Sequence, residues 1–219
     1  MKNLNSKIVA AGMLMLMFSL ILLSKDNTTI SSKLNIRAFN NAGLSGEEMN
    51  RVGNEMQRIF RQTGIEASWT DCGTRETPNP ACNEQLGPSD FILRILGGGA
   101  AKGSGLAGST LGVSMTPVQG GVLASVYYGK VEELAKQRLA SHPQILAHAA
   151  THELGHLLLG QLPHTPQGIM RAQWGRTDLQ DMSMRRLNFN STQAGLMKAD
   201  LQKRMEEAGT EQAASIVKK

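Results

Sequence analysis

The chain has 219 residues, of which 41% are hydrophobic and 19% are charged, a composition that is typical of a globular protein and excludes wholesale disorder. This length suffices for one well-packed domain and is too short for two of ordinary size. The formal net charge is +5, but Lys2, Lys7 and Lys25 lie at the N-terminus, so the remaining chain is nearly balanced and nucleic-acid binding is not expected.

The first 24 residues have the pattern of an export signal. Lys2 and Lys7 precede a largely apolar run from residue 8 to residue 23, the order of charge and apolar residues that leaves the positive end in the cytoplasm. The run is shorter than a membrane span of about 20 residues, and no Ala-x-Ala cleavage site follows it. We therefore expect residues 1–24 to be a signal peptide or an N-terminal membrane anchor, which would bring contact with a membrane; a buried core helix is the alternative. The domain that follows is expected outside the cytoplasm, in a secreted, periplasmic or membrane-anchored protein.

A strand, a helix and a second strand are predicted next. Residues 34–38 alternate between apolar and polar side chains, which is a strand pattern. Ser45 and Glu48 have the spacing of a capping box, apolar residues then recur at helical intervals, and Gly64 occupies the position of a C-terminal cap. Alternation resumes at residues 65–69, so we expect a right-handed crossover between two parallel strands.

Two cysteines, Cys72 and Cys82, are the only ones in the sequence. They lie in a predicted loop over residues 71–88, too far apart for a redox Cys-x-x-Cys motif. In an exported protein a disulfide between them is the natural interpretation. A pair of unrelated thiols is the alternative.

A third strand and a hairpin are predicted after this loop. Residues 91–95 have the composition of a strand, and residues 111–115 and 122–126 would form the two arms of a hairpin that turns at residues 116–121. The glycine-rich stretch from residue 97 to residue 121 contains no Gly-Lys-Ser/Thr, which excludes a phosphate-binding P-loop. Its expected role is either a mobile loop facing the substrate or a surface linker.

Three helices are predicted in the second half of the chain. Residues 130–140 have an apolar side, and residues 141–160 follow with Ser141 as the expected N-cap. Ser191 is the expected N-cap of a final helix whose apolar stripe ends near Ala208. Residues 209–219 are expected to be a flexible tail.

The sequence His152-Glu153-Leu154-Gly155-His156 carries the chemistry of a metal site. Four residues advance about 400° on an α-helix, so His152 and His156 lie on one face, one turn apart, where two imidazoles can bind one Zn²⁺. Glu153 is offset around the helix, so it is placed as a general base beside a water on the metal. The alternative is a core helix with incidentally exposed histidines.

A catalytic zinc ion needs a third protein ligand and an open fourth position. Gly160 lets the chain leave the helix in a left-handed conformation, and His164 follows after this turn. His164 is therefore the expected third ligand, with Asp178 or Asp181 as its rivals. Of the other two histidines, His148 rotates off the metal face, where a supporting or solvent-exposed role is expected, and His142 is expected at the surface.

These residues resemble the metzincin metallopeptidases, which carry His-Glu-x-x-His-x-x-Gly-x-x-His followed by a turn that contains methionine. Relative to that pattern, Gly160 is one residue late and His164 two residues late. The resemblance implies three zinc ligands, a base and a turn methionine: His152, His156, His164, Glu153 and Met170. It also implies an α+β fold, a metzincin-like single domain over residues 34–208. In that fold a twisted mixed sheet packs on an active-site helix, and a small C-terminal helical subdomain follows.

The sequence therefore predicts a zinc-dependent hydrolase of peptide bonds. It would bind one Zn²⁺ and a peptide or protein substrate, act by Glu153-assisted attack of a zinc-bound water, and be a monomer. An extended peptide is expected to pair with the edge strand around Val113. Two alternatives are a non-catalytic envelope protein with a structural zinc site and a membrane-associated binding module.

Overall fold

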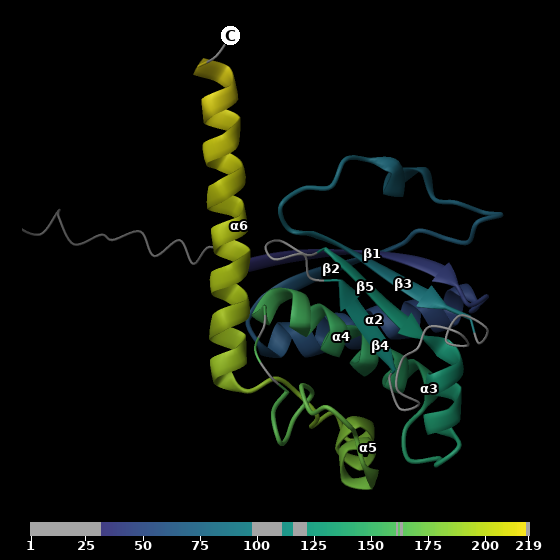
Figure 1. Ribbon diagram of the computed structural model, residues 1–219. Helices are drawn as coiled ribbons and strands as arrows, with labels where there is room; N and C mark the ends of the chain where they lie inside the picture. The colour runs from purple at the N-terminus through teal and green to yellow at the C-terminus, as the bar shows by residue number, and fades with distance from the viewer. Residues whose placement is uncertain (1–31, 98–110, 116–121, 161, 163, 218–219) are drawn as a thin grey trace, which may run out of the picture. The chain divides into compact units, whose positions relative to one another are not determined.

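The computed structural model describes residues 32–97, 111–115, 122–160, 162 and 164–217 (Figure 1). From Ser31 onward the chain forms one compact unit. The expected signal peptide or anchor at residues 1–24 lies outside the described residues. Within the described ranges, no helix combines the length and the apolar character that crossing a membrane requires.

The first three elements are the predicted strand, helix and strand. Strand β1 (Ser32–Asn41) alternates buried and partly exposed side chains, helix α2 spans Gly46–Gln62, and β2 (Ile65–Asp71) pairs with β1 in parallel. The predicted capping box is present, because the Ser45 amide donates to the Glu48 carboxylate at 2.9 Å and the Glu48 amide donates to the Ser45 hydroxyl. The predicted parallel pairing is confirmed.

The sheet has five strands in the order β2-β1-β3-β5-β4. Strands β3 (Asp90–Leu96) and β5 (Leu123–Tyr127) continue the parallel set, and β4 (Gly112–Met115) is an antiparallel edge strand on β5. The two arms of the predicted hairpin are therefore confirmed. Its expected turn at residues 116–121, and most of the glycine-rich stretch before it, lie outside the described residues.

Helix α3 (Tyr128–Ala135) is shorter than the predicted helix over residues 130–140. The chain leaves the helix at Lys136, and Arg138 takes a φ of +56°, which a continuing α-helix does not allow. The prediction extended the helix to residue 140 because Leu139 fits the apolar periodicity. Leu139 packs against the core, but it does so from a loop rather than from a helix.

Helix α4 (His142–Leu159) is the predicted central helix. It begins after Ser141, whose amide donates to the Gln144 side chain at 3.1 Å. It ends at Gly160, which has the expected positive φ, +65°. Most of its residues are buried, and together with α2 it covers one face of the sheet, while the loop after β2 lies over the other (Figure 1).

The C-terminal part contains two helices where one was predicted. Helix α5 (Arg176–Ser183) was not predicted. Helix α6 (Ser191–Val217) is capped by Asn190, whose side chain accepts from the Gln193 amide at 2.8 Å, so the expected cap at Ser191 is wrong by one residue. The helix continues past Ala208 to Val217, and the flexibility of residues 209–219 stays a prediction.

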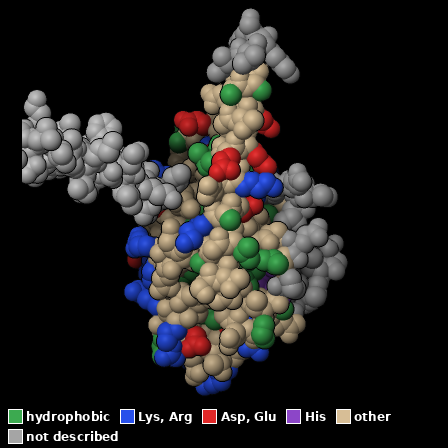
Figure 2. Space-filling view, turned by 90° about the vertical axis from the view of Figure 1, so that its left-hand side faces the viewer, with side chains coloured by type: hydrophobic (Ala, Val, Ile, Leu, Met, Phe, Trp, Pro, Cys, Tyr) green, Lys and Arg blue, Asp and Glu red, His purple; other side chains and the backbone are tan. Residues whose placement is uncertain are grey.

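Figure 2, which faces α6, shows acidic and basic side chains on the same face.

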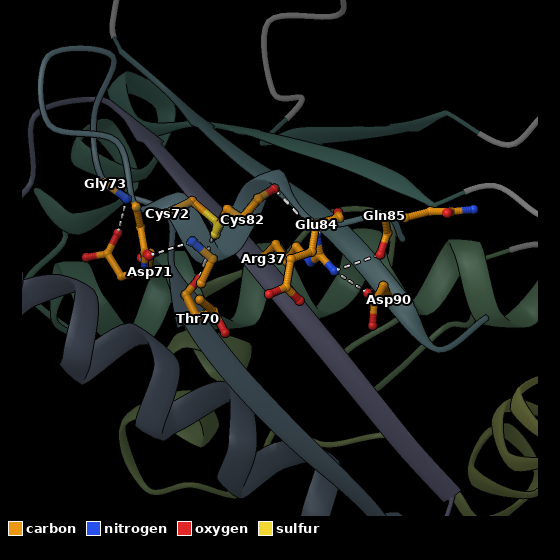
Figure 3. Close-up of a disulfide and its surroundings, with 11 residues drawn as sticks. Arg37, Thr70, Asp71, Cys72, Gly73, Cys82, Glu84, Gln85 and Asp90 are labelled. Atoms are coloured by element: carbon orange, nitrogen blue, oxygen red, sulfur yellow. Dashed lines mark hydrogen bonds and ion pairs between the residues drawn. A yellow bond between two sulfur atoms is a disulfide. The ribbon is translucent and has the colours of Figure 1, made fainter. Parts of the chain in front are cut away.

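The predicted disulfide between Cys72 and Cys82 is present. Its loop lies against the open face of the sheet, where the Arg37 guanidinium of β1 donates to the backbone carbonyls of Glu84 and Gln85 (Figure 3). The same guanidinium forms an ion pair with Asp90 at 2.6 Å. Arg37 and the disulfide thus fix the two ends of this loop.

Replacing both cysteines by alanine is expected to lower the free energy of unfolding by about 2–3 kcal/mol, because the unfolded chain then no longer carries a closed loop of this length. Urea unfolding of the oxidised wild type and of the double variant measures the difference. Wild-type protein treated with reductant should match the variant. Equal stability of all three would show that the disulfide constrains nothing.

Candidate metal centre

Three imidazoles meet at the C-terminal half of α4. The Nε2 atom of His156 lies 3.0 Å from Nε2 of His152 and 3.1 Å from Nε2 of His164. His152 and His156 are one turn apart on α4, and His164 reaches them from the segment after Gly160. The structure therefore brings together the three histidines that the sequence singled out.

The protonation state of His152 is fixed by a backbone carbonyl. Its Nδ1 lies 2.7 Å from the carbonyl oxygen of Ile169. A carbonyl oxygen can only accept a hydrogen bond, so the ring proton is on Nδ1. The lone pair of Nε2 is then free and faces the other two rings. Burial lowers the pKa of His152, and burial together with the two neighbouring imidazoles lowers the pKa of His156 to about 4. Both rings are thus held neutral, the form that binds metal ions.

The donor set fits a zinc ion. With Zn–N distances of about 2.0–2.1 Å, two nitrogen ligands of a tetrahedral site lie about 3.3 Å apart, and the observed Nε2 separations of 3.0 and 3.1 Å are close to this value. Within the described residues the group of candidate ligands consists of these three histidines alone. Three imidazole ligands with the fourth position left open are the arrangement of a catalytic zinc site.

A buried carboxylate lies next to the three rings. Glu153 is only 7% exposed, and burial raises its pKa to about 8, while a hydrogen bond from the Ser114 side chain acts in the opposite direction. A cation bound nearby would favour the charged form of this carboxylate. A carboxylate whose pKa lies near neutrality is suited to accept and return a proton.

Met170 packs against α4 at Gly155, between His152 and His156 in the sequence. A Cβ atom at Gly155 would lie 2.7 Å from the Met170 sulfur and 2.9 Å from the Phe189 ring. Glycine at this position of α4 therefore lets the methionine turn approach between the two helical histidines. The turn also supplies the Ile169 carbonyl that holds His152.

The three histidines and Glu153 open into a cleft of about 850 Å³. Edge strand β4 forms one wall, α3 forms another, and the segment that follows Met170 forms a third. On α3, Lys130 and Glu133 form an ion pair at 3.3 Å. The cleft is large enough for a short segment of extended peptide.

Comparisons with known proteins address the fold. The sequence matches no family model and no curated protein. Among solved structures it is similar to archaemetzincin from Methanopyrus kandleri, with a TM-score of 0.51 and 16% identity over 79% of this chain and 98% of that one. This chain has an archaemetzincin-like fold. A zinc-dependent peptidase from Methanocorpusculum labreanum also matches, with a TM-score of 0.48 and 15% identity over 74% and 99% of the two chains. The α+β, metzincin-like fold predicted from the motif is confirmed.

In this archaemetzincin-like fold the two rival carboxylates have other partners. Asp178 accepts from the Gly175 amide at 2.8 Å and from the Arg171 guanidinium at 2.9 Å, so it caps α5. Asp181 forms an ion pair with Arg186 at 2.8 Å. Neither belongs to the histidine cluster.

The remaining two histidines of the archaemetzincin-like domain differ sharply in environment. His142 is exposed at the first turn of α4, as predicted. His148 is fully buried, which excludes a solvent-exposed role; its Nδ1 lies 2.8 Å from the Gln144 carbonyl, and its ring packs edge-on against Trp174. Trp174 in turn packs against His152 and donates to the Ile169 carbonyl at 3.3 Å.

Trp174 is a site residue that the sequence motif did not reveal. It contacts His152, the first histidine of the cluster, shares that histidine's carbonyl acceptor and lines the cleft. The available signal was a lone tryptophan in a polar segment, four residues after Met170. Arg171 and Gly112 also line the cleft and carry no motif that would have identified them.

Lowering the pH is expected to destabilise the archaemetzincin-like domain through His148. Burial lowers the pKa of this histidine from 6.5 to about 4, although Glu55 acts in the opposite direction. Below pH 6.5 the unfolded chain binds a proton here that the folded chain does not. The contribution of His148 to the free energy of unfolding should therefore fall by about 1.4 kcal/mol per pH unit as the pH drops from 6.5 towards 4.

Urea unfolding at neutral pH and at about pH 5 measures this slope. His148→Asn provides the comparison, because its amide can replace the Nδ1 hydrogen bond and does not titrate. The variant should show a shallower slope than the wild type. Identical slopes would contradict the assignment to His148.

Proposed function

We propose that this protein is a zinc metallopeptidase that hydrolyses peptide bonds in peptide or protein substrates. The observation that carries the proposal is the convergence of three imidazole Nε2 atoms beside a buried carboxylate at the base of an open cleft. The archaemetzincin-like fold supports it. One ion is expected, because the three imidazoles form a single cluster.

A catalytic site agrees better with the residues than a structural one. Structural zinc sites are closed by four protein ligands, whereas the cluster within the described ranges has three members. Glu153 would also have no role in a structural site, although its burial costs stability. These two features favour the enzyme over a non-catalytic zinc protein.

The side chains of this chain have distinct tasks in the proposed reaction. His152, His156 and His164 would hold the ion, which when bound acidifies a water molecule and polarises a carbonyl group. The Glu153 carboxylate accepts the proton of the attacking water and delivers it to the nitrogen of the leaving amine. The Ile169 carbonyl keeps His152 in the tautomer that directs Nε2 at the ion.

The substrate is proposed to bind along edge strand β4. This strand pairs with β5 on one side and ends the sheet of the described residues on the other. Its outer backbone groups would therefore receive an extended peptide as an additional strand. Because β4 also forms a wall of the cleft, such a peptide would pass in front of the three histidines.

Export is proposed as well, with residues 1–24 as a signal peptide or membrane anchor. The apolar run after Lys2 and Lys7 supports this proposal. The disulfide between Cys72 and Cys82 is consistent with it, because such bonds persist outside the reducing cytoplasm.

A chelator experiment tests the proposed activity. Purified protein should cleave casein or a mixed peptide library, lose this activity with 1,10-phenanthroline, and regain it when zinc is added back. A wild-type protein that holds stoichiometric zinc and cleaves no peptide would instead indicate a structural zinc site.

A further inference from the structure

We infer that strand β4 positions the catalytic base: Gly112 leaves the space that the Glu153 carboxylate occupies, and Ser114 holds that carboxylate by a hydrogen bond. This inference rests on the proposed peptidase function. It assigns positioning roles to two residues that lie outside the metal-binding motif.

The contact between Gly112 and Glu153 is unusually close. A Cβ atom at Gly112 would lie 2.7 Å from Cγ of Glu153 and 3.0 Å from its Oε1. It would also lie 2.7 Å from the backbone carbonyl oxygen of Ser125 on β5. A side chain at residue 112 therefore has no room unless the Glu153 carboxylate moves away and β4 moves away from β5.

The position of β4 is fixed on its other side. Gly112 is paired with Val126, and the Tyr127 amide donates to the Leu111 carbonyl at 2.9 Å. The β5 backbone cannot yield easily, because β5 lies inside the sheet between β3 and β4. The Glu153 side chain has rotatable bonds, so a side chain at residue 112 would displace it, and β4 would in addition have to shift away from the Ser125 carbonyl.

Ser114 lies two residues further along the same strand, and its side chain hydrogen-bonds Glu153. Side chains two residues apart in a strand point to the same side, so the hydroxyl and the space at Gly112 both face α4. The strand that is proposed to receive the peptide thus also carries both contacts of the base. Strand β4 would therefore hold both the substrate and the Glu153 carboxylate.

Gly112→Ala is expected to lower kcat by about 100-fold, because a displacement of about 1 Å of a reacting group costs this much. Zinc content should be unchanged, since none of the three histidines is replaced. Gly195→Ala is the matched control, because it makes the same change on α6, where a Cβ atom would meet no neighbour within 4 Å, and it should have wild-type kinetics.

Ser114→Ala is the second variant, because it adds no atoms and cannot disturb the hairpin by a clash. We expect kcat to fall about tenfold, as for a lost hydrogen bond to a charged group, and Ser114→Thr to restore it, because threonine keeps the hydroxyl. Wild-type activity in both Gly112→Ala and Ser114→Ala would overturn the inference. An inactive wild-type protein would instead overturn the proposed function, so the two failures are distinguishable.

Discussion

Glu153→Gln is expected to reduce peptide hydrolysis by at least about 10²–10⁴-fold while the protein keeps its zinc. Glutamine has nearly the same shape as glutamate and does not accept a proton, so the change removes the base and leaves the packing in place. Glu153 is buried and lines the same cleft as the three histidines. The other carboxylate of the described cleft lining, Glu133, is paired with Lys130 on α3, so it is not expected to take over this role. Steady-state kinetics on a peptide substrate and metal analysis of the same sample measure the two quantities.

Glu132→Gln is the matched control for this experiment. Glu132 is an exposed residue of α3 outside the cleft lining, so its replacement makes the same chemical change without touching the site. The control should have wild-type kinetics. Full activity in Glu153→Gln would refute the role of Glu153, and loss of zinc in that variant would mean that the carboxylate is a ligand instead.

Replacing any one of the three clustered histidines by alanine is expected to lower the affinity for zinc by more than about 100-fold, since even the loss of a group that only orients a ligand costs about 10–100-fold. Peptide hydrolysis should disappear with the metal. Competition with a chromophoric zinc chelator measures the affinity, and His152, His156 and His164 should give effects of the same order, because their Nε2 atoms form one cluster.

His142→Ala is the control, because His142 lies on the same helix and is exposed. It should bind zinc as the wild type does. We expect His164→Ala to differ from this control as clearly as the His152 and His156 variants do. A His164→Ala protein with unchanged affinity would show that the third ligand lies elsewhere.

The parts of the fold that were predicted correctly are those specified by local chemistry. The capping box at Ser45 and Glu48 and the positive φ of Gly160 depend on residues within one turn of each other. Helix α5 was missed because it spans only eight residues, and its first turn is stabilised by Asp178 reaching the Gly175 amide. Such a short helix shows too few apolar repeats to be separated from a polar loop.

The residues of the candidate site fall into the same two groups, those that local geometry places and those that only the fold brings together. His152, Glu153 and His156 could be placed relative to one another because helical geometry alone fixes them. The position of His164 beside the other two rings depends on the path of the chain after Gly160. The sequence suggested a turn there, but only the fold determines where that turn leads. The contacts of Trp174 with His152, and of Gly112 with Glu153, join segments far apart in the sequence, and no local pattern encodes them.

A crystal structure of the zinc-loaded protein, with data collected on both sides of the zinc absorption edge, would show whether the three histidines bind one ion. We expect one strong anomalous peak, bound by Nε2 of His152, His156 and His164 at about 2.0–2.1 Å, with no fourth protein ligand. A peak elsewhere, a fourth side chain closing the site, or a His164 ring turned away from the metal would contradict it.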